Sequence, residues 1–282
     1  MACVLFFHSQ LTNKESLVDL KVFKDRNFTA GTIIQVVIQA VLYASLAILP
    51  QFLQSMMGYT AFLSGATMMP RGLGSMTAMM ITATLSNKLD NRLMVVAGLS
   101  LIGGAGLAFG ALNLQISNMN IAIPNFFMGM GMGLSMVPIM NLSVDTLKNE
   151  QMTNATGIQN LLKNIGSAIG TSLVATMLTR FAQIHQYMLV GKLNDLNPVF
   201  ISKMQSTAGA LSAYAHQSVA QYMAQYSLYG DLIKQSTLWA FIDSFRIFGV
   251  ICFLVIPLML LMKKPKKAEV VVEEVKTPAG VK

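Results

Sequence analysis

Residues 28–54 read FTAGTIIQVVIQAVLYASLAILPQFLQ, and no side chain in this stretch is charged. A helix needs about 20 predominantly apolar residues to cross the hydrocarbon core of a bilayer. Further apolar stretches follow at residues 61–85, 93–112, 121–144, 155–179 and 238–262. Lipid offers backbone polar groups no hydrogen-bond partner, and runs this long and continuous are not typical of barrel strands. The sequence therefore predicts an all-α polytopic membrane protein with six transmembrane helices, whose surroundings are a lipid bilayer.

The charges of the chain are few and unevenly distributed. They make up 11% of the residues, against about 25% in ordinary soluble domains. Loops 55–60 and 113–120 carry no Lys or Arg, whereas the intervening loops and the segments that flank the first and last spans are basic. The basic residues on that side are Lys14, Lys21, Lys24, Arg26, Lys88, Arg92, Lys148, Lys263, Lys264, Lys266 and Lys267. Cytoplasmic loops are enriched in Lys and Arg, so both termini are predicted to be cytoplasmic and the net charge of +8 does not indicate a nucleic-acid partner.

This topology divides the chain into five segments. Residues 1–27 form a cytoplasmic lead-in with the remnant of a preceding helix, and residues 28–179 form five spans. Residues 180–237 form a long extracytoplasmic loop, residues 238–262 the sixth span, and residues 263–282 a disordered cytoplasmic tail.

The long loop carries apolar residues with a helical period, which predicts one amphipathic helix. The residues on this face are Met204, Ala208, Leu211, Ala215, Val219, Tyr222 and Tyr226. Two interpretations stay open at this point. The helix either packs as a lid on the external mouth or at the lipid interface, or it docks a periplasmic partner protein.

Signals for enzymatic or metal chemistry are missing from the sequence. The two cysteines, Cys3 and Cys252, lie near opposite ends of the chain, and His8, His185 and His216 have no metal-ligand spacing. Neither a nucleotide-binding loop nor a catalytic triad is recognisable. We therefore expect no enzymatic activity, no cofactor and no bound metal.

Arg71 is a charge inside an apolar stretch long enough to span a bilayer. Such a residue costs roughly 2.5–3.5 kcal/mol on insertion scales, and it often marks a substrate or ion path. The residue lies about ten positions from the external loop, or about 15 Å at helical rise. Pro70 interrupts the local hydrogen bonds, and Gly72 and Gly74 let a neighbouring backbone approach. Arg71 is either a gating or proton-linked cation that pairs with an acidic residue or freed carbonyls, or a structural charge that snorkels outward.

Two further sets of charges fall in the predicted spans. Lys163 either lies deep in the fifth span, where a desolvated lysine can exchange protons, or sits at the cytoplasmic face. Asp243 and Arg246 are spaced i,i+3 near the external end of the last span, so they can pair with each other. A proton-carrying role for Asp243 is the alternative.

Glycines mark the expected helix contacts. Gly129 and Gly133 lie one turn apart in the fourth span, and Gly166 and Gly170 form a Gly-x-x-x-Gly pair in the fifth. Small residues at this spacing allow two helix backbones to pack closely.

Several phrases of the sequence together resemble a known family. They are LVDLKVFKDRNF at 17–28, MGYTAFLSG at 57–65, PRGLGSM at 70–76, NKLDNR at 87–92 and NATGIQNLLKNIGSAIGTSL at 154–173. In this order they resemble the carboxyl-terminal half of the fourteen-helix drug/proton antiporters of the major facilitator superfamily, of the EmrB/QacA type. The resemblance extends over roughly residues 16–262 and leaves the amino-terminal half of such a protein unmatched.

The resemblance implies a proton-coupled multidrug efflux transporter of the inner membrane, whose substrates are amphipathic drug-like small molecules. It also implies a missing amino-terminal half. Asp90 and Arg92 resemble the superfamily's cytoplasmic loop motif, which latches helices; a charged two-helix connector is the alternative. Two other functions stay open: a non-transporting remnant, and a membrane scaffold whose external loop docks a periplasmic adaptor protein.

Overall fold

A computed structural model describes residues 20–86, 89–114, 116–147, 149–194, 196–213 and 216–262. Every regular element in these ranges is a helix, which confirms the predicted all-α class. Most of the predicted lead-in (residues 1–19) and the predicted tail (residues 263–282) lie outside the described residues. The same holds for Asn87 and Lys88 of the NKLDNR phrase.

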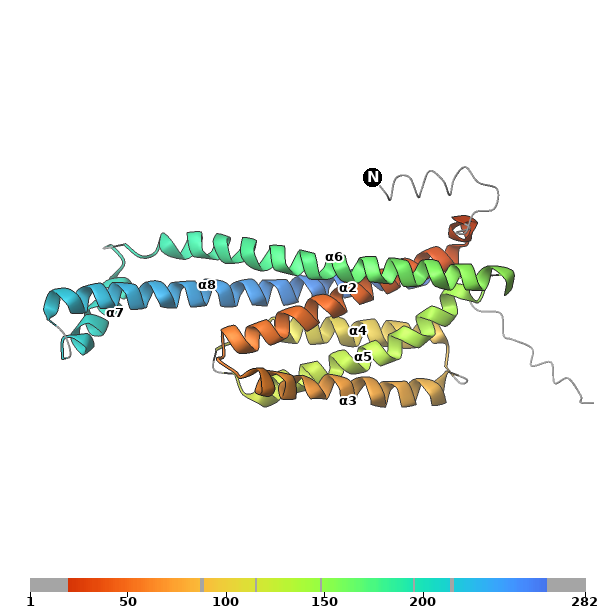
Figure 1. Cartoon of the computed structure of the whole chain (residues 1–282), viewed down its shortest axis with the longest axis horizontal. Helices are drawn as coiled ribbons and strands as arrows, with labels where there is room; N and C mark the ends of the chain where they lie inside the picture. The colour runs from red at the N-terminus through yellow and green to blue at the C-terminus, as the bar shows by residue number, and fades with distance from the viewer. Residues whose placement is uncertain are drawn as a thin grey trace, which may run out of the picture.

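Six long helices account for the predicted spans. The elements in chain order are η1 (Leu20–Lys24), α2 (Arg26–Ser55), α3 (Ala61–Leu85), α4 (Asn91–Phe109), α5 (Asn118–Val144), α6 (Asn149–Val190), α7 (Pro198–Leu211), α8 (Gln217–Val255) and α9 (Leu258–Leu261). Figure 1 shows α2 to α6 and α8 running along one common direction. Within the described part of the chain, α2, α4, α5, α6 and α8 are long and apolar enough to cross a membrane. The sixth, α3, is 25 residues long and contains Pro70 and Arg71.

Side-chain caps fix where several helices begin. Asp25 accepts a hydrogen bond from the Phe28 amide at 2.9 Å, and Asp90 accepts one from the Arg92 amide at 3.1 Å. Asn197 does the same for α7, where Pro198 occupies the first helical turn. An oxygen-bearing side chain at this position satisfies an amide that has no partner inside the helix.

The core lies where α2, α4, α5 and α8 meet. Phe52 and Phe241 pack edge to face with ring centroids 5.4 Å apart, and Phe109 packs against Phe245 at 5.0 Å. All four rings are buried. On the outside of this core, α3 packs mainly on α5, and α6 packs on α2 and α8. Of the helices long and apolar enough to span a membrane, α6 is the least buried along its most apolar stretch.

Glycines make the closest helix contacts. A Cβ atom added at Gly129 would collide with the backbone oxygen of Arg71, and one added at Gly170 would collide with the backbone oxygen of Ala40. The other predicted packing glycines, Gly74, Gly133 and Gly166, also lie against a neighbouring helix. Gly72 differs, because a Cβ there would meet no described atom within 4 Å outside its own helix and chain neighbours. Most of these glycines thus let α3 approach α5 and α6 approach α2.

The segment expected to be a loop with one amphipathic helix is divided differently in the structure. Helix α6 continues unbroken to Val190, and α8 begins already at Gln217. The described apolar residues predicted to share one helix fall on two, because a turn after Leu211 separates α7 from α8. Ala215, which belongs to the same predicted face, lies outside the described residues. The 3.6-residue spacing happens to stay in register across this turn, so the sequence pattern does not reveal it.

We call residues 186–237 the helical arm. In Figure 1 the amino-terminal half of α8 extends beyond the ends of α2, α3, α4 and α5, with α7 beside its tip. Helix α7 packs on α8, so the described part of the arm is not folded over the ends of α2 to α5. We refer to the end of the bundle that bears the arm as the arm end.

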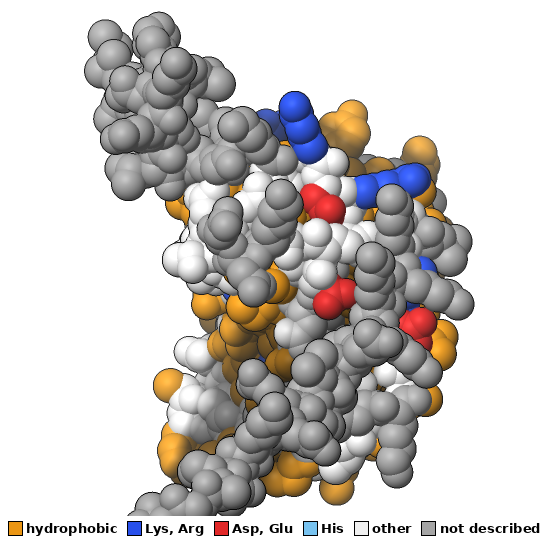
Figure 2. All heavy atoms as spheres, turned by 90° about the vertical axis from the view of Figure 1, so that its right-hand side faces the viewer, with side chains coloured by type: hydrophobic (Ala, Val, Ile, Leu, Met, Phe, Trp, Pro, Cys, Tyr) orange, Lys and Arg blue, Asp and Glu red, His pale blue; other side chains and the backbone are white. Residues whose placement is uncertain are grey.

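The opposite end of the bundle holds the starts of α2, α4 and α6. Figure 2 looks onto this end and shows basic and acidic side chains at its surface. The charged residues described there include Lys24, Asp25, Arg26, Asp90 and Asp145. Asp25 also accepts a hydrogen bond from the Thr146 hydroxyl at 2.8 Å, which joins the start of α2 to the end of α5.

Candidate functional site

Arg71 lies buried between α3 and α5. Its side chain is held by two residues of α5: Nε donates a hydrogen bond to Oδ1 of Asn125 at 2.9 Å, and Nη2 lies 2.8 Å from Sδ of Met128. Asn125 is itself fully buried and donates from Nδ2 to the backbone oxygen of Thr67 at 3.2 Å. Arg71 therefore points into the contact between two helices, and with 6% of its surface exposed it does not snorkel outward.

The positive charge of Arg71 has no acidic partner in the described residues. None of the ion pairs formed there includes this arginine. Its Nη1 atom is buried and has no hydrogen-bond partner in the described part of the chain. In place of the expected acidic residue or freed carbonyls, an amide and a thioether contact the guanidinium, and both are neutral. A buried charge without a counter-charge is costly, and this makes Arg71 a candidate functional residue.

Local sequence explains how α5 reaches Arg71. Asn125, Met128 and Gly129 share one face of α5, because they are spaced by three and four residues. Gly129 sets the backbone of α5 directly against that of Arg71. A larger residue at position 129 would hold the helices apart and move Asn125 away from the guanidinium.

Lys163 is not brought together with Arg71. It is half-buried on α6, a helix that starts at Asn149, earlier than the sequence analysis assumed. Its position is therefore about 21 Å along α6 at helical rise, and its depth in the membrane stays a prediction. The ion pairs found in the described ranges do not include Lys163.

Asp90 and Arg92 lie at the start of α4 and contact different groups. Asp90 caps the helix by accepting a hydrogen bond from the Arg92 amide. The Arg92 guanidinium donates from Nη2 to the backbone oxygen of Met262, the last described residue after α9. The pair therefore ties the beginning of α4 to the end of the sixth predicted span.

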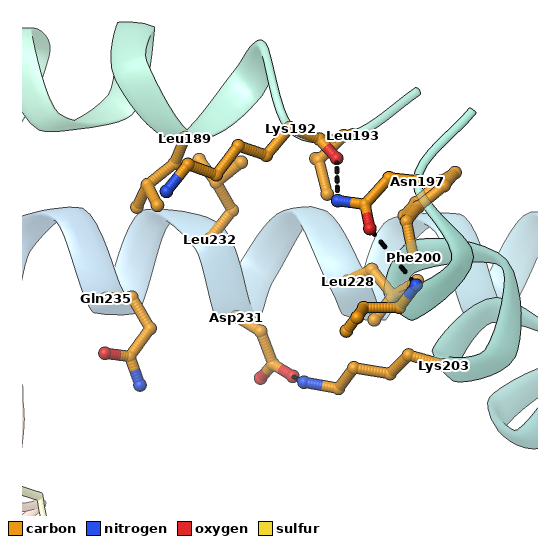
Figure 3. Close-up of a pocket in the computed structure, with 11 residues that line it drawn as sticks. Leu189, Lys192, Leu193, Asn197, Phe200, Lys203, Leu228, Asp231, Leu232 and Gln235 are labelled. Atoms are coloured by element: carbon orange, nitrogen blue, oxygen red, sulfur yellow. Dashed lines mark hydrogen bonds and ion pairs between the residues drawn. The ribbon is translucent and has the colours of Figure 1, made fainter. Parts of the chain in front are cut away.

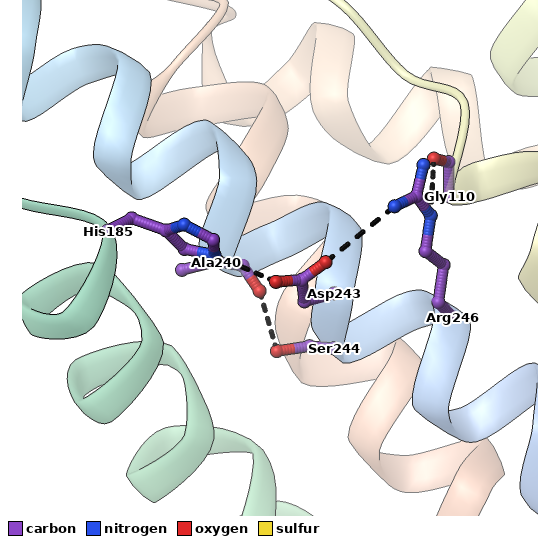
Figure 4. A network of polar contacts seen from close by, with 6 residues as sticks. All are labelled: Gly110, His185, Ala240, Asp243, Ser244 and Arg246. Atoms are coloured by element: carbon purple, nitrogen blue, oxygen red, sulfur yellow. Dashed lines mark hydrogen bonds and ion pairs between the residues drawn. The ribbon is translucent and has the colours of Figure 1, made fainter. Parts of the chain in front are cut away.

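Asp243 and Arg246 form a larger contact than their spacing predicts. Nη1 of Arg246 lies 3.8 Å from Oδ1 of Asp243, and Nε donates to the backbone oxygen of Gly110 at 3.1 Å (Figure 4). On the other side of the carboxylate, Nε2 of His185 lies 2.8 Å from Oδ2. This network joins α6, α8 and the end of α4 at the arm end of the bundle.

His185 was not predicted to belong to this network. The residue is 58 positions from Asp243 in sequence. Only the continuation of α6 past residue 179 brings the imidazole beside α8. A helix-breaking residue is absent between 180 and 190 in the sequence, and this was the available signal.

A second buried polar cluster was also missed. The side-chain amides of Gln159 and Gln35 both lie against the Ser143 hydroxyl, at 2.6 and 3.5 Å. These three residues of α6, α2 and α5 are almost completely buried. Both glutamine Oε1 atoms lack a hydrogen-bond partner among the described residues. Glutamines inside the uncharged run 28–54 were the sequence signal for this cluster.

The arm contains a groove where the connection from α6 to α7 crosses α8. Figure 3 shows Leu189, Phe200, Leu228 and Leu232 pointing into it. Nζ of Lys203 closes one side with an ion pair to Asp231 at 3.3 Å. The apolar contacts fasten the connecting segment and α7 onto α8.

Comparisons with known proteins identify relatives of this chain. The chain matches the family model of the Major Facilitator Superfamily over residues 7–171. It is 27% identical over 271 residues to the colistin resistance protein EmrB of Acinetobacter baumannii, covering 95% of this chain and 52% of that protein. It is 28% identical over 199 residues to the multidrug export protein EmrB of Escherichia coli, covering 67% of this chain and 37% of that protein. The MFS-type transporter YhcA of Bacillus subtilis is 26% identical over 238 residues, covering 84% of this chain and 44% of YhcA.

A solved structure shares the fold. A bacterial homologue of the human lysosomal transporter Spinster, in an inward-facing and unoccupied conformation, superposes with a TM-score of 0.52 at 14% sequence identity. The superposition covers 90% of this chain and 53% of that chain. The chain thus spans about half the length of the curated relatives and of the transporter that it matches. These findings confirm the resemblance to EmrB-type proteins. The family model covers more than half of the chain, and the chain therefore belongs to the Major Facilitator Superfamily.

Proposed function

We propose that this chain is the carboxyl-terminal half of a proton-coupled multidrug efflux transporter of the bacterial inner membrane. The observation that carries the proposal is the burial of Arg71 without an acidic partner in the described residues, inside a member of a transporter family. A charge at this depth is retained in membrane proteins mainly for function. Relatives named for multidrug export and drug resistance support the substrate class of amphipathic small molecules.

The other half of the transporter is part of the proposal. Transporters of this superfamily consist of two six-helix halves that rock around a site near the bilayer midplane. The curated relatives are about twice as long as the segment that matches here. We infer that an amino-terminal half, encoded with this chain or separately, completes the site beside α3 and α6.

The proposed orientation places the arm on the periplasmic side of the membrane and both termini in the cytoplasm. The basic residues Lys24, Arg26 and Arg92 lie at the end opposite the arm, which agrees with the positive-inside rule. In this orientation the contact of Arg92 with Met262 acts as a cytoplasmic latch, and the network of Asp243 and Arg246 lies at the external surface. Arg71 and Lys163 then provide two separate charges within the membrane for gating or proton exchange.

Proton-driven efflux tests this function. The chain is combined with the amino-terminal half of a relative in inside-out vesicles, and uptake of a fluorescent drug is followed after a proton gradient is imposed. We expect uptake in the parent, a loss of at least about tenfold for Arg71→Ala because its contacts to α5 and its charge are removed, and no loss for Arg180→Gln on the exposed face of α6. Undiminished uptake by Arg71→Ala would contradict the assignment of Arg71.

A membrane scaffold is the second candidate function. The arm projects beyond the bundle and exposes tyrosines, with 85% of Tyr187, 76% of Tyr222 and 83% of Tyr226 accessible. Exposed tyrosines are common in protein-binding surfaces. A photo-crosslinker at position 222 that captures a periplasmic adaptor protein, in vesicles that show no efflux, would favour the scaffold. If neither crosslinking nor efflux occurs, the chain is a non-transporting remnant.

A further inference from the structure

We propose that His185 and Asp243 form a pH-dependent clamp, which fastens the end of α6 to α8 when the imidazole is protonated. The inference goes beyond the proposed function, because it concerns the attachment of the helical arm and not the passage of a drug. It starts from the contact of Nε2 of His185 with Oδ2 of Asp243 at 2.8 Å (Figure 4). This contact joins the two helices immediately before the arm begins on α6 and shortly after it ends on α8.

Two residues one turn apart on α8 surround the imidazole. The ring centroid of Trp239 lies 6.1 Å from that of His185, and Asp243 follows four positions later on the same face of the helix. The side chains of His185 and Asp243 are 22% and 32% exposed. Protons from solvent therefore reach the pair, although its charges are screened less than those of a fully exposed pair.

The two oxygens of the Asp243 carboxylate have different partners. Nη1 of Arg246 lies 3.8 Å from Oδ1, and Nε of the same arginine donates to the Gly110 carbonyl at 3.1 Å. Arg246 is thus held at the end of α4 and approaches one oxygen of the carboxylate. The other oxygen, Oδ2, faces His185.

Protonation of the imidazole changes the strength of the contact. Histidine ordinarily gains or loses a proton between about pH 5 and 8. A protonated imidazole adds the attraction between opposite charges to its hydrogen bond with the carboxylate, whereas a neutral imidazole retains the hydrogen bond alone. We therefore expect the clamp to be tight at acidic pH and to loosen as the pH rises.

Other charges near the clamp do not replace the imidazole. Helices α2 and α8 pack on α6, with a smaller contact from α5, and residues 28–54 and 118–144 carry no charge. The charged residues of α8 and of the adjoining part of α6 are Arg180, Asp231, Lys234, Asp243 and Arg246. Of these, Arg180 and Lys234 are exposed, and Asp231 pairs with Lys203. Tyr229 of the arm accepts a hydrogen bond from the Gln186 amide. The imidazole thus faces one carboxylate and, on its far side, one guanidinium.

Loosening of the clamp should free α6 rather than α8. The bond of Arg246 to the Gly110 carbonyl does not involve the imidazole, so α8 stays tied to α4. Residues 183–188 of α6 are partly or fully exposed, and little burial holds this part of the helix against α8. The part of α6 around His185 is therefore expected to move away from α8 at alkaline pH.

Fluorescence of Trp239 tests the protonation of His185, because this is the only tryptophan of the chain. A protonated imidazole beside an indole ring quenches its emission more strongly than a neutral imidazole. The whole chain is placed in lipid nanodiscs, and emission is followed between about pH 8 and 5. We expect a reversible loss of emission on acidification. His185→Gln should abolish this loss, and His216→Gln, at the exposed start of α8, should retain it. Constant emission in the parent, or an equal loss in His185→Gln, would overturn the inference.

A distance measurement tests the clamp itself. Spin labels are attached at positions 184 on α6 and 234 on α8, in a variant whose Cys3 and Cys252 are replaced. We expect a narrow distribution of distances at about pH 5 and a broader, longer one at about pH 8. A second pair of labels, at the exposed positions 107 on α4 and 250 on α8, is the control and should give the same distribution at both pH values. A distance between positions 184 and 234 that does not respond to pH would overturn the inference.

Two variants separate protonation from clamping. Asp243→Asn removes the opposite charge, so the distance between positions 184 and 234 should lose its pH dependence while Trp239 is still quenched on acidification. His185→Lys carries a charge throughout this pH range and should keep the distribution narrow at both pH values. A pH-dependent distance that persists in Asp243→Asn, or a broad distribution at both pH values in His185→Lys with the helical signal intact, would overturn the clamp.

The clamp and the transport function are tested independently. The fluorescence and distance measurements use neither a drug nor a proton gradient, so their failure leaves the proposed efflux function unchanged. Loss of efflux in the vesicle assay, with the pH-dependent distance intact, contradicts only the transport proposal.

Discussion

The guanidinium of Arg71 is held by an amide and a thioether, and this choice of partners has an energetic consequence. Arg71 and Asn125 are both buried, and each uses the other to satisfy a polar group. Removing one partner leaves the other desolvated and unpaired, whereas replacing both with apolar groups removes the need for either. The two residues should therefore behave as a coupled unit.

A double-mutant cycle measures this coupling. We expect Asn125→Leu to lower the free energy of unfolding by about 1–3 kcal/mol, because Nε of Arg71 loses its acceptor. The double variant Arg71→Met/Asn125→Leu should recover most of this loss. Equilibrium unfolding in mixed detergent, followed by circular dichroism, provides the values. Additive effects in the double variant would show that the two residues are not coupled.

The sequence singled out Arg71 but did not identify its partners. Its place within an uncharged run predicts an intramembrane charge, and Pro70 and Gly74 predict a close helix contact. Asn125 could not be chosen as its partner, because an isolated asparagine among methionines and phenylalanines carries no spacing signal. The partner depends on how far α5 is rotated and shifted along α3, and this is a property of packing.

At the scale of helices, glycines control how closely neighbouring elements approach. Gly170 faces the backbone of Ala40, whereas Gly72 on α3 has no neighbouring atom from another helix within 4 Å among the described residues. The two positions thus offer a contrast between a packed and an unpacked glycine in helices of the same bundle.

Gly170→Val should separate α6 from α2 and destabilise the bundle by about 1–3 kcal/mol, because the added atoms collide with backbone that cannot move aside easily. Gly72→Ala should leave stability within about 0.5 kcal/mol. Thermal unfolding of both variants in the same detergent provides the comparison. A Gly170→Val variant as stable as the parent would contradict the close contact.

Loss of one contact in the network around Asp243 should cause local opening at the arm end. His185→Ala removes the described contact of the α6 side chain with the Asp243 carboxylate, while Arg246 keeps its bond to Gly110. We expect faster amide hydrogen exchange in residues 184–194 and unchanged exchange in α4. His216→Ala, at the exposed start of α8, is the control and should change neither region. Uniformly faster exchange in all helices would indicate general destabilisation instead.

Helix boundaries mark the limit of the sequence prediction at this scale. The apolar runs located the spans because burial in lipid requires them. They could not show that α6 and α8 continue past the bundle, since a helix outside the membrane need not be apolar. The sequence 180–190 mixes polar and apolar residues without a helix breaker, and Gly191 follows it. The missing helix breaker was the available signal for the continuation of α6.

The bundle and the arm form two distinct parts of one fold. Helix α7 contacts mainly α8, and the buried core residues of the bundle lie outside the arm. Apolar side chains that line the groove, including Leu228 and Phe200, pack within the arm. The stability of the bundle should therefore depend little on the outer part of the arm.

Replacing residues 194–226 with a short Gly-Ser linker tests this separation. We expect the melting temperature of the bundle to fall by no more than a few degrees, about 2–4 °C for each kcal/mol lost in a domain of this size, because the network of His185 and Asp243 stays in place. Circular dichroism in detergent measures the melting temperature. Loss of the helical signal at room temperature would show that the arm is required for folding.

The length of α8 also has a mechanical consequence. From Arg246 to Gln217 the helix continues without interruption, a distance of about 43 Å at 1.5 Å per residue. In a straight helix of this length, a tilt of about 10° near Arg246 would move the amino-terminal end by about 7.5 Å. Displacements too small to resolve inside the membrane would thus become measurable as a change in distance between spin labels, one at the tip and one on the end of α4.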